Sequence, residues 1–338
     1  MTATTQTTRS VEGKRSLLDS IKTVMRDKPI VPLTILLIGL VVVLELVRPG
    51  IVRERWIANT LKFAIPLAIL AAAQTLTMLT GGIDLSVGIV ASMAAFIMGT
   101  QVPNVDPVIA ITVALSAAAL AGLASGIGVG IFRVHPLIMT LAIGLIVVGL
   151  LQLYQRTTLG TGTEYPEALL WLGTGVSTLP LVGLGVPNSL LIFIPLALII
   201  GFGLKRSGFG RLLYAIGDNE RAARLSGVRV WQVLIVLYVL SGLIAGIGGL
   251  VYVGLIQSSS LQIAAPLLLP SIAAAVIGGT SIFGGRGGYS GTIVGALILQ
   301  VLATLLTVLQ MPESTRRIIF GLIILVVTAL YVRITGDR

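Results

Sequence analysis

The stretch Leu79-Thr80-Gly81-Gly82-Ile83-Asp84-Leu85-Ser86-Val87-Gly88 separates two long apolar runs and decides how the chain folds. It contains three glycines, a carboxylate and two hydroxyl groups, whereas the flanking runs, residues 65–78 and 89–98, contain no charged residue. An ionisable side chain between two candidate membrane-spanning segments marks a candidate functional site.

The composition of the whole chain supports a membrane protein. Of the 338 residues, 55% are hydrophobic and 11% are charged, with a mean hydropathy of +1.02, whereas soluble domains have about 25% charged residues. Apolar runs near the length of a spanning helix recur from residue 29 onward. We therefore expect an all-α membrane protein, a polytopic bundle of about ten transmembrane helices. Residues 29–338 would form a single transmembrane domain.

Ten apolar segments are candidate spans. They are Ile30–Val47, Ile57–Thr80, Leu85–Gln101, Pro107–Phe132, Pro136–Gln155, Ser189–Leu204, Trp231–Ile256, Pro266–Phe283, Tyr289–Leu309 and Arg317–Val332. Glycines at positions 122, 126 and 130, and at 242, 246 and 249, fall at or near helical spacing. Such ladders predict closely packed helices in lipid.

The basic residues predict the orientation. With ten spans and the N-terminus inside, sixteen of the 23 Lys and Arg residues fall on the cytoplasmic side and six on the outer side, with Lys62 at the outer start of a span. Cytoplasmic loops carry the excess of Lys and Arg, so both termini should lie in the cytoplasm. The net charge of +10 is accordingly interpreted as a topology signal and not as nucleic-acid binding.

Three segments outside the spans have open interpretations. Residues 1–28 form a predicted cytoplasmic tail, in which residues 10–28 read as a basic amphipathic helix that either binds the anionic membrane surface or is simply solvated. Residues 156–188 form an outer loop with Trp171, which is a lid, a docking surface or a plain connection. Residues 205–230 form the longest predicted inner loop between spans.

Asp84 has two interpretations. Gly81 and Gly82 break the chain, so Asp84 or Ser86 could cap the next helix by accepting its free backbone N–H groups. Alternatively, the break lines a pathway, because irregular backbone at membrane depth is tolerated where it faces a cavity or protein.

The inner loop contains the second motif, Ser207–Val228. A short helix over residues 220–226 is predicted, capped by Asn219 or Asp218 and ended by Gly227 at the C′ position. A short solvent-facing helix between two spans could bind another protein, or it could be an ordinary surface loop.

The third motif, Ile277–Gly288 (IGGTSIFGGRGG), places Gly284, Gly285, Arg286 and Gly287 in an inner turn. It lacks the Lys-Ser/Thr ending of a phosphate-binding P-loop, and the sequence contains no such motif. A tight inner glycine-rich turn is the preferred interpretation.

In this order and at these separations, the three motifs resemble those of the permease subunits of bacterial ABC sugar importers of the ribose/xylose/arabinose type. The resemblance extends from about residue 29 to residue 333. It implies a permease domain that works as a homo- or heterodimer in the bacterial inner membrane. It also implies a cytoplasmic ABC ATPase that binds ATP and Mg²⁺, and an extracytoplasmic sugar-binding protein. This chain would then bind no cofactor or metal and would not be an enzyme.

The resemblance also assigns roles to residues. The loop at residues 205–230 would be the coupling loop, with ATPase-coupling residues Gly217, Asp218, Asn219, Glu220, Ala222, Ala223, Arg224 and Gly227. The substrate pathway should be weakly polar, and we expect it to include Gln74, Thr75, Thr77, Asp84, Ser86 and Ser92. Serine and threonine in spans can equally bond back to their own helix.

The chain departs from many relatives at residues 266–271, Pro-Leu-Leu-Leu-Pro-Ser, where an acidic stretch is common. The monosaccharide class follows from the resemblance, but the particular sugar does not. Sugar alcohols, nucleosides and a furanosyl signal are alternative cargoes. A secondary transporter or channel is less compatible, because ion-coupled carriers place charges inside spans and these interiors hold almost none. An intramembrane enzyme would need clustered acids, histidines or a nucleophile with a base, and the chain has one histidine and no cysteine.

Overall fold

The computed structural model describes residues 30–158, 163–178, 185–258, 260–312, 314–319, 321–322 and 325–326. This part is helical apart from one short two-stranded ribbon. In chain order the elements are α2 (Ile30–Val47), α3 (Glu54–Met78), α4 (Val87–Gln101), α5 (Pro107–Gly130), α6 (Pro136–Thr157), α7 (Glu167–Thr174), β1 (Val176–Thr178), β2 (Gly185–Pro187), α8 (Leu190–Arg206), α9 (Gly208–Leu225), α10 (Val230–Ile256), the 3-10 helix η1 (Ala265–Leu267), α11 (Leu268–Ile277) and α12 (Tyr289–Val308).

The all-α membrane prediction is confirmed. Among the described residues, 6 helices are long and apolar enough to cross a membrane, or up to 7 if α8 and α9, bent by 65°, form one span. The count of ten spans and their direction stay predictions. The tail at residues 1–28 lies outside the described residues, and the last predicted span is described only in part, where it is helical.

Two predicted spans are shorter in the structure than in the sequence interpretation. Residues 85–101 become α4, a helix of 15 residues. Residues 266–283 become η1 and the 10-residue α11. α11 ends before Gly278 and Gly279, and Gly279 has φ +88°, a left-handed conformation that terminates a helix and that glycine adopts without steric cost.

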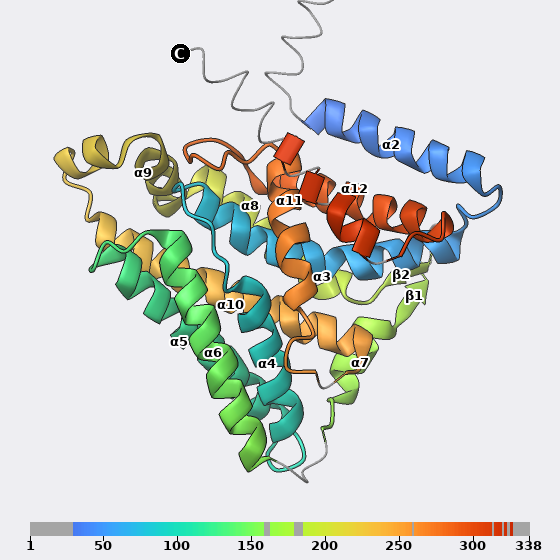
Figure 1. Ribbon diagram of the computed structural model, residues 1–338, viewed down its shortest axis with the longest axis horizontal. Coiled ribbons are helices and arrows are strands. Elements are labelled where there is room, and N and C mark those ends of the chain that lie inside the picture. The colour runs from blue at the N-terminus through green and yellow to red at the C-terminus, as the bar shows by residue number, and fades with distance from the viewer. Residues whose placement is uncertain are drawn as a thin grey trace, which may run out of the picture.

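The core of the molecule is built from α3, α4 and α10 (Figure 1). α10 packs most extensively on α5, and the predicted ladder glycines lie between them except Gly249, which packs against Ala91 of α4. A Cβ on Gly122 would collide with the backbone carbonyl of Tyr238, and a Cβ on Gly242 would collide with that of Ala118. The small residues therefore let the two backbones come into direct contact, as the ladders predicted.

The predicted outer loop folds back onto the ends of α3 and α10. α7 packs on α10, and β1 pairs with β2 in antiparallel register, Val176 opposite Pro187. Two charged side chains of α3 fasten this region: Glu54 accepts a hydrogen bond from the N–H of Gly185 at 2.6 Å, and Lys62 donates to the carbonyl of Thr174. Trp171 is half exposed. A role as a lid or docking surface stays a prediction.

Candidate functional site

The three motifs of the sequence meet at one end of the molecule, where the α3–α4 loop, α9 and the α11–α12 loop lie together (Figure 1). The backbone N–H of Gly285 donates to the carbonyl of Leu79 at 2.9 Å. The hydroxyl of Tyr214 in α9 donates to the carbonyl of Gly287 at 2.9 Å. We call this contact region, formed by residues 79–81, 214–218 and 284–287, the motif junction.

Gly217 is the centre of the motif junction. A Cβ at this position would collide with the carbonyl of Leu79 and the N–H of Gly285, both of which are backbone atoms that cannot rotate away. A side chain on residue 217 would thus separate all three motifs. The predicted coupling residue Gly217 therefore lies in direct contact with both other motifs.

The short helix predicted after this point is present and is terminated as predicted. α9 is interrupted at Asn219, whose φ of −158° and ψ of 98° are not helical. The Asn219 side chain accepts a hydrogen bond from the N–H of Ala222 at 2.9 Å, so Asn219 and not Asp218 is the cap. Gly227 has φ +83°, and its N–H donates to the carbonyl of Arg224 at 3.0 Å. This is the glycine-terminated end that the sequence predicted.

The short helix, residues 220–225, presents most of its side chains to solvent. Glu220 and Arg224 form an ion pair one turn apart, and their side chains are 48% and 41% exposed. Leu225 is 83% exposed, while Ala223 is buried. The short helix is therefore accessible from solvent on most of its surface.

Asp84 is buried and fully engaged in hydrogen bonds. One carboxylate oxygen accepts from the N–H of Ser86 at 3.0 Å and from its hydroxyl at 2.5 Å, and the other accepts from the hydroxyl of Ser241 in α10 at 2.8 Å. The Gln74 amide also holds the backbone of residue 84, donating to its carbonyl at 2.7 Å. Asp84 therefore ties the start of α4 to α3 and α10.

The capping interpretation of this stretch is correct in part. Asp84 accepts a backbone N–H immediately before α4, while Ser86 makes no side-chain cap. The pathway interpretation stays a prediction.

The other predicted pathway hydroxyls are buried and bond within the protein. Thr75 donates to the carbonyl of Ala71 and contacts the hydroxyl of Thr292 at 2.7 Å. Thr77 bonds to its own helix, and Ser92 bonds to its helix while accepting the N–H of Ala264 at 3.0 Å. The structure brings Gln74, Asp84 and Ser86 together. A path through the other three would require these bonds to open.

The glycine-rich turn is a tight backbone structure in which the N–H groups of Gly284 and Gly285 donate to the carbonyls of Ser281 and Leu79. Gly284, Gly285 and Gly287 have φ values of +90°, +71° and +131°. Arg286 is exposed, and its carbonyl accepts the N–H of Ser281 at 2.9 Å. Because the N–H of Gly285 donates to the carbonyl of Leu79, the turn connects the α11–α12 loop to the end of α3. This agrees with the preferred interpretation as a tight glycine-rich turn.

Sequence reasoning missed two partners of the first motif. Ser241 bonds Asp84, and Thr140 in α6 accepts the N–H of Leu85 at 3.0 Å. Only the position of Ser241 beside Gly242, in the packing ladder, hinted that it faces another helix. Within the described residues, no group of three or more acidic or histidine side chains could hold a metal ion.

Comparison with known proteins places this arrangement in a family. Residues 56–328 match the family described as branched-chain amino acid transport system / permease component. The chain is 33% identical over 325 residues to the ribose import permease of Escherichia coli, covering 94% of this chain and 97% of the relative. It is 33% identical over 294 residues to the ribose import permease of Bacillus subtilis, covering 86% and 89%.

A third relative is the fructose import permease of Rhizobium meliloti, 34% identical over 273 residues and covering 78% of this chain and 73% of the relative. No solved structure matches the chain. The family match and these relatives agree with the resemblance drawn from the three motifs. The chain therefore belongs to this family of ABC importer permeases, as a multi-pass membrane subunit that carries no catalytic activity of its own.

Proposed function

We propose that the protein is the membrane-spanning permease subunit of an ATP-driven importer that translocates a monosaccharide by alternating access. A binding protein outside the cell membrane would deliver the sugar. A cytoplasmic ABC ATPase would bind ATP and Mg²⁺ and drive the cycle, so this chain would need no cofactor. A second permease subunit would complete the translocation path.

The observation that carries the proposal is the mechanical connection of the exposed helix to the bundle. The short helix at residues 220–225 would dock on the ATPase through its exposed face, which includes Glu220 and Leu225. Gly217, two residues before the Asn219 break, contacts the loop that leads from α3 to Asp84. Movement of the helix would therefore displace the α3–α4 loop. Through the hydrogen bond between Asp84 and Ser241, it would also displace the middle of α10. Packed contacts of this kind couple the movement of one element to that of the next when a protein switches between two conformations.

The cargo is proposed from the relatives, because their names specify import of ribose and fructose. Buried hydroxyl and amide groups in α3 and α4 could exchange their internal hydrogen bonds for a neutral sugar during the cycle. A branched-chain amino acid, after which the matching family is named, is the second candidate. An amino acid carries a charged ammonium group, which would need a carboxylate partner in the pathway. Asp84 is the one acid buried among the described core residues, so it would be that partner.

The proposed orientation places the short helix in the cytoplasm, with both termini on the same side. Arg133, Lys205, Arg211, Arg224 and Arg229 would then lie on the cytoplasmic side. This agrees with the excess of basic residues expected in cytoplasmic loops.

The proposal is tested by purifying the tagged permease from native membranes and identifying what comes with it by mass spectrometry. We expect an ABC ATPase and a sugar-binding protein, and the purified binding protein should bind a monosaccharide in a calorimetric screen. A binding protein selective for amino acids would select the second candidate. A permease that purifies alone and moves sugar without ATP would overturn the proposal in favour of a secondary transporter or channel.

A further inference from the structure

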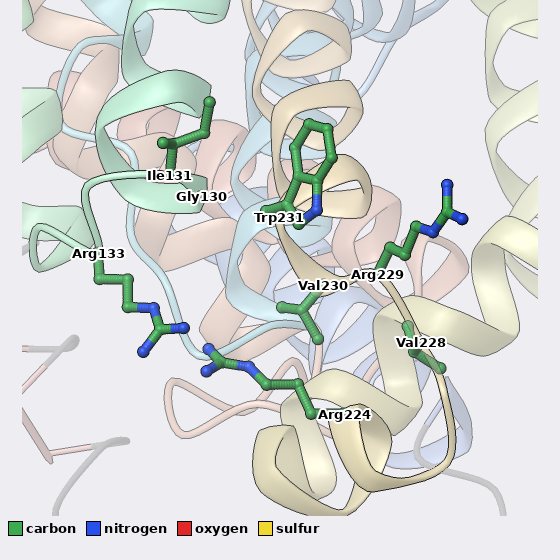
Figure 2. Close-up of a pocket in the computed structure, with 8 residues that line it drawn as sticks. All are labelled: Gly130, Ile131, Arg133, Arg224, Val228, Arg229, Val230 and Trp231. Carbon is green, nitrogen blue, oxygen red and sulfur yellow. The ribbon is translucent and has the colours of Figure 1, made fainter.

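A cavity of about 490 Å³ lies behind the short helix, where α5 ends and α10 begins. Eight residues line it: Gly130, Ile131, Arg133, Arg224, Val228, Arg229, Val230 and Trp231 (Figure 2). Three of these are arginines and none is acidic. A second cavity of about 300 Å³ adjoins it and shares Arg133 and Arg224, and Glu220, the ion-pair partner of Arg224, also lines this second cavity.

The two shared arginines come from different elements and point toward one another across the cavity (Figure 2). Arg224 forms an ion pair with Glu220. Arg133 forms no ion pair with an acidic side chain among the described residues. Arg133 is held in the left-handed conformation, φ +55°, directly after the apolar end of α5. Because Glu220 offsets the charge of Arg224, Arg133 is the guanidinium in this pair without a neutralising carboxylate in the described part of the chain. Planar guanidinium forks suit phosphate oxygens.

The rim of the cavity is apolar. Ile131 and Trp231 line it and are 52% and 46% exposed, and the neighbouring Phe132 is 72% exposed. These residues end α5 and begin α10, two helices long and apolar enough to cross a membrane. Tryptophan and large apolar side chains at the end of a span are typical of the level of the lipid headgroups. A ligand at this place can therefore have its charge in the cavity and its acyl chains in the membrane.

We propose that this cavity binds the phosphate headgroup of an anionic phospholipid of the cytoplasmic leaflet, held between Arg133 and Arg224. The side of the membrane rests on the proposed function, but the binding itself does not. Since Arg224 belongs to the short helix and Arg133 to the α5–α6 loop, a bound headgroup would brace the helix against the bundle.

The test is lipid retention by the purified protein. Protein reconstituted into equal mixtures of phosphatidylglycerol and phosphatidylcholine is washed in detergent, and the retained lipids are identified by native mass spectrometry. We expect preferential retention of phosphatidylglycerol. Arg133→Gln should lower that retention about fivefold, which is the usual contribution of one basic residue near anionic lipid. Arg133→Lys should retain much of it. Glutamine is accepted at this backbone conformation elsewhere in the chain, at Gln257 and Gln310.

Arg211→Gln is the matched control, because Arg211 is exposed on α9 and lines neither cavity. Equal losses in Arg133→Gln and Arg211→Gln would mean general surface attraction and would overturn the proposal. So would the absence of any lipid preference. If inorganic phosphate alone raised the melting temperature as much as phosphatidylglycerol, and Arg133→Gln abolished both effects, the ligand would be a free anion. Failure of ATPase co-purification would count against the proposed function and leave this site intact.

Discussion

The backbone N–H of Gly285 donates a hydrogen bond to the carbonyl of Leu79 at 2.9 Å, joining two motifs that are far apart in the sequence. Gly217 packs against both groups, so the loop that carries the short exposed helix cannot move without changing this contact. The motif junction is thus the place where movement of that helix is passed to the α3–α4 loop.

Gly217→Ala should weaken the motif junction. The added methyl group would meet two backbone groups, and overpacking of this kind costs about 1–3 kcal/mol of folding stability. We expect a lower melting temperature and a loss of ATP-driven transport. The matched control is Gly208→Ala in the same helix, where the nearest atom is the end of the Arg211 side chain at 3.9 Å. Transport and stability equal to those of the unmodified protein in Gly217→Ala would contradict the role of the junction.

Glu220→Lys should abolish the stimulation of the partner ATPase while leaving the permease folded. The ion pair with Arg224 is exposed, and such pairs contribute only about 0.3–0.5 kcal/mol to stability, so the effect would lie in docking. The measurement is ATP hydrolysis by the assembled importer with and without the loaded binding protein. Arg211→Glu, a charge reversal in α9 outside the short helix, is the control. Normal stimulated turnover in Glu220→Lys would exclude coupling through this helix.

Asp84→Asn distinguishes a structural acid from a pathway acid. The asparagine oxygen can still accept from Ser86, and the Ser241 hydroxyl can rotate to accept from the new amide, so near-normal transport is expected. Asp84→Ala removes every acceptor and should destabilise the fold by about 1–3 kcal/mol. Thermal unfolding and uptake are measured on both variants. A correctly folded Asp84→Asn variant that does not transport would instead support a pathway role.

Local structure was predictable from the sequence wherever adjacent residues determine it. The helix over residues 30–47 has the predicted bounds, and α12 begins at the predicted Tyr289. Gly227 ends the short helix because the left-handed conformation at that point favours glycine. Asn219 caps it because its side chain reaches the free N–H of Ala222.

Contacts across the chain were not predictable in the same way. Nothing in the sequence pairs Asp84 with Ser241, since that bond depends on how α10 packs against α4. The same holds for the hydroxyl of Tyr289, which donates to the carbonyl of Ala68 at 3.1 Å. Hydropathy also overestimated the segment at residues 266–283, because apolar composition does not report that Gly278 and Gly279 end α11. In the segment at residues 85–101, α4 begins two residues later than predicted and ends at the predicted Gln101.

Single-cysteine labelling should establish the orientation. The chain has no cysteine, so one introduced thiol reports its own side of the membrane without background. Thr178→Cys in β1 should react with a membrane-impermeant maleimide in intact cells, and Ser226→Cys should react only after the membrane is opened. Both parent side chains are exposed. The reverse pattern would place the short helix outside and contradict its docking on a cytoplasmic ATPase.

ATP-driven import is tested most directly by uptake of labelled monosaccharide into proteoliposomes that contain the permease and its ATPase, with the binding protein added outside. Uptake should require both ATP in the lumen and the binding protein, and it should stop in Glu220→Lys. Uptake by the permease alone, without ATP and unaffected by Glu220→Lys, would overturn the proposed function.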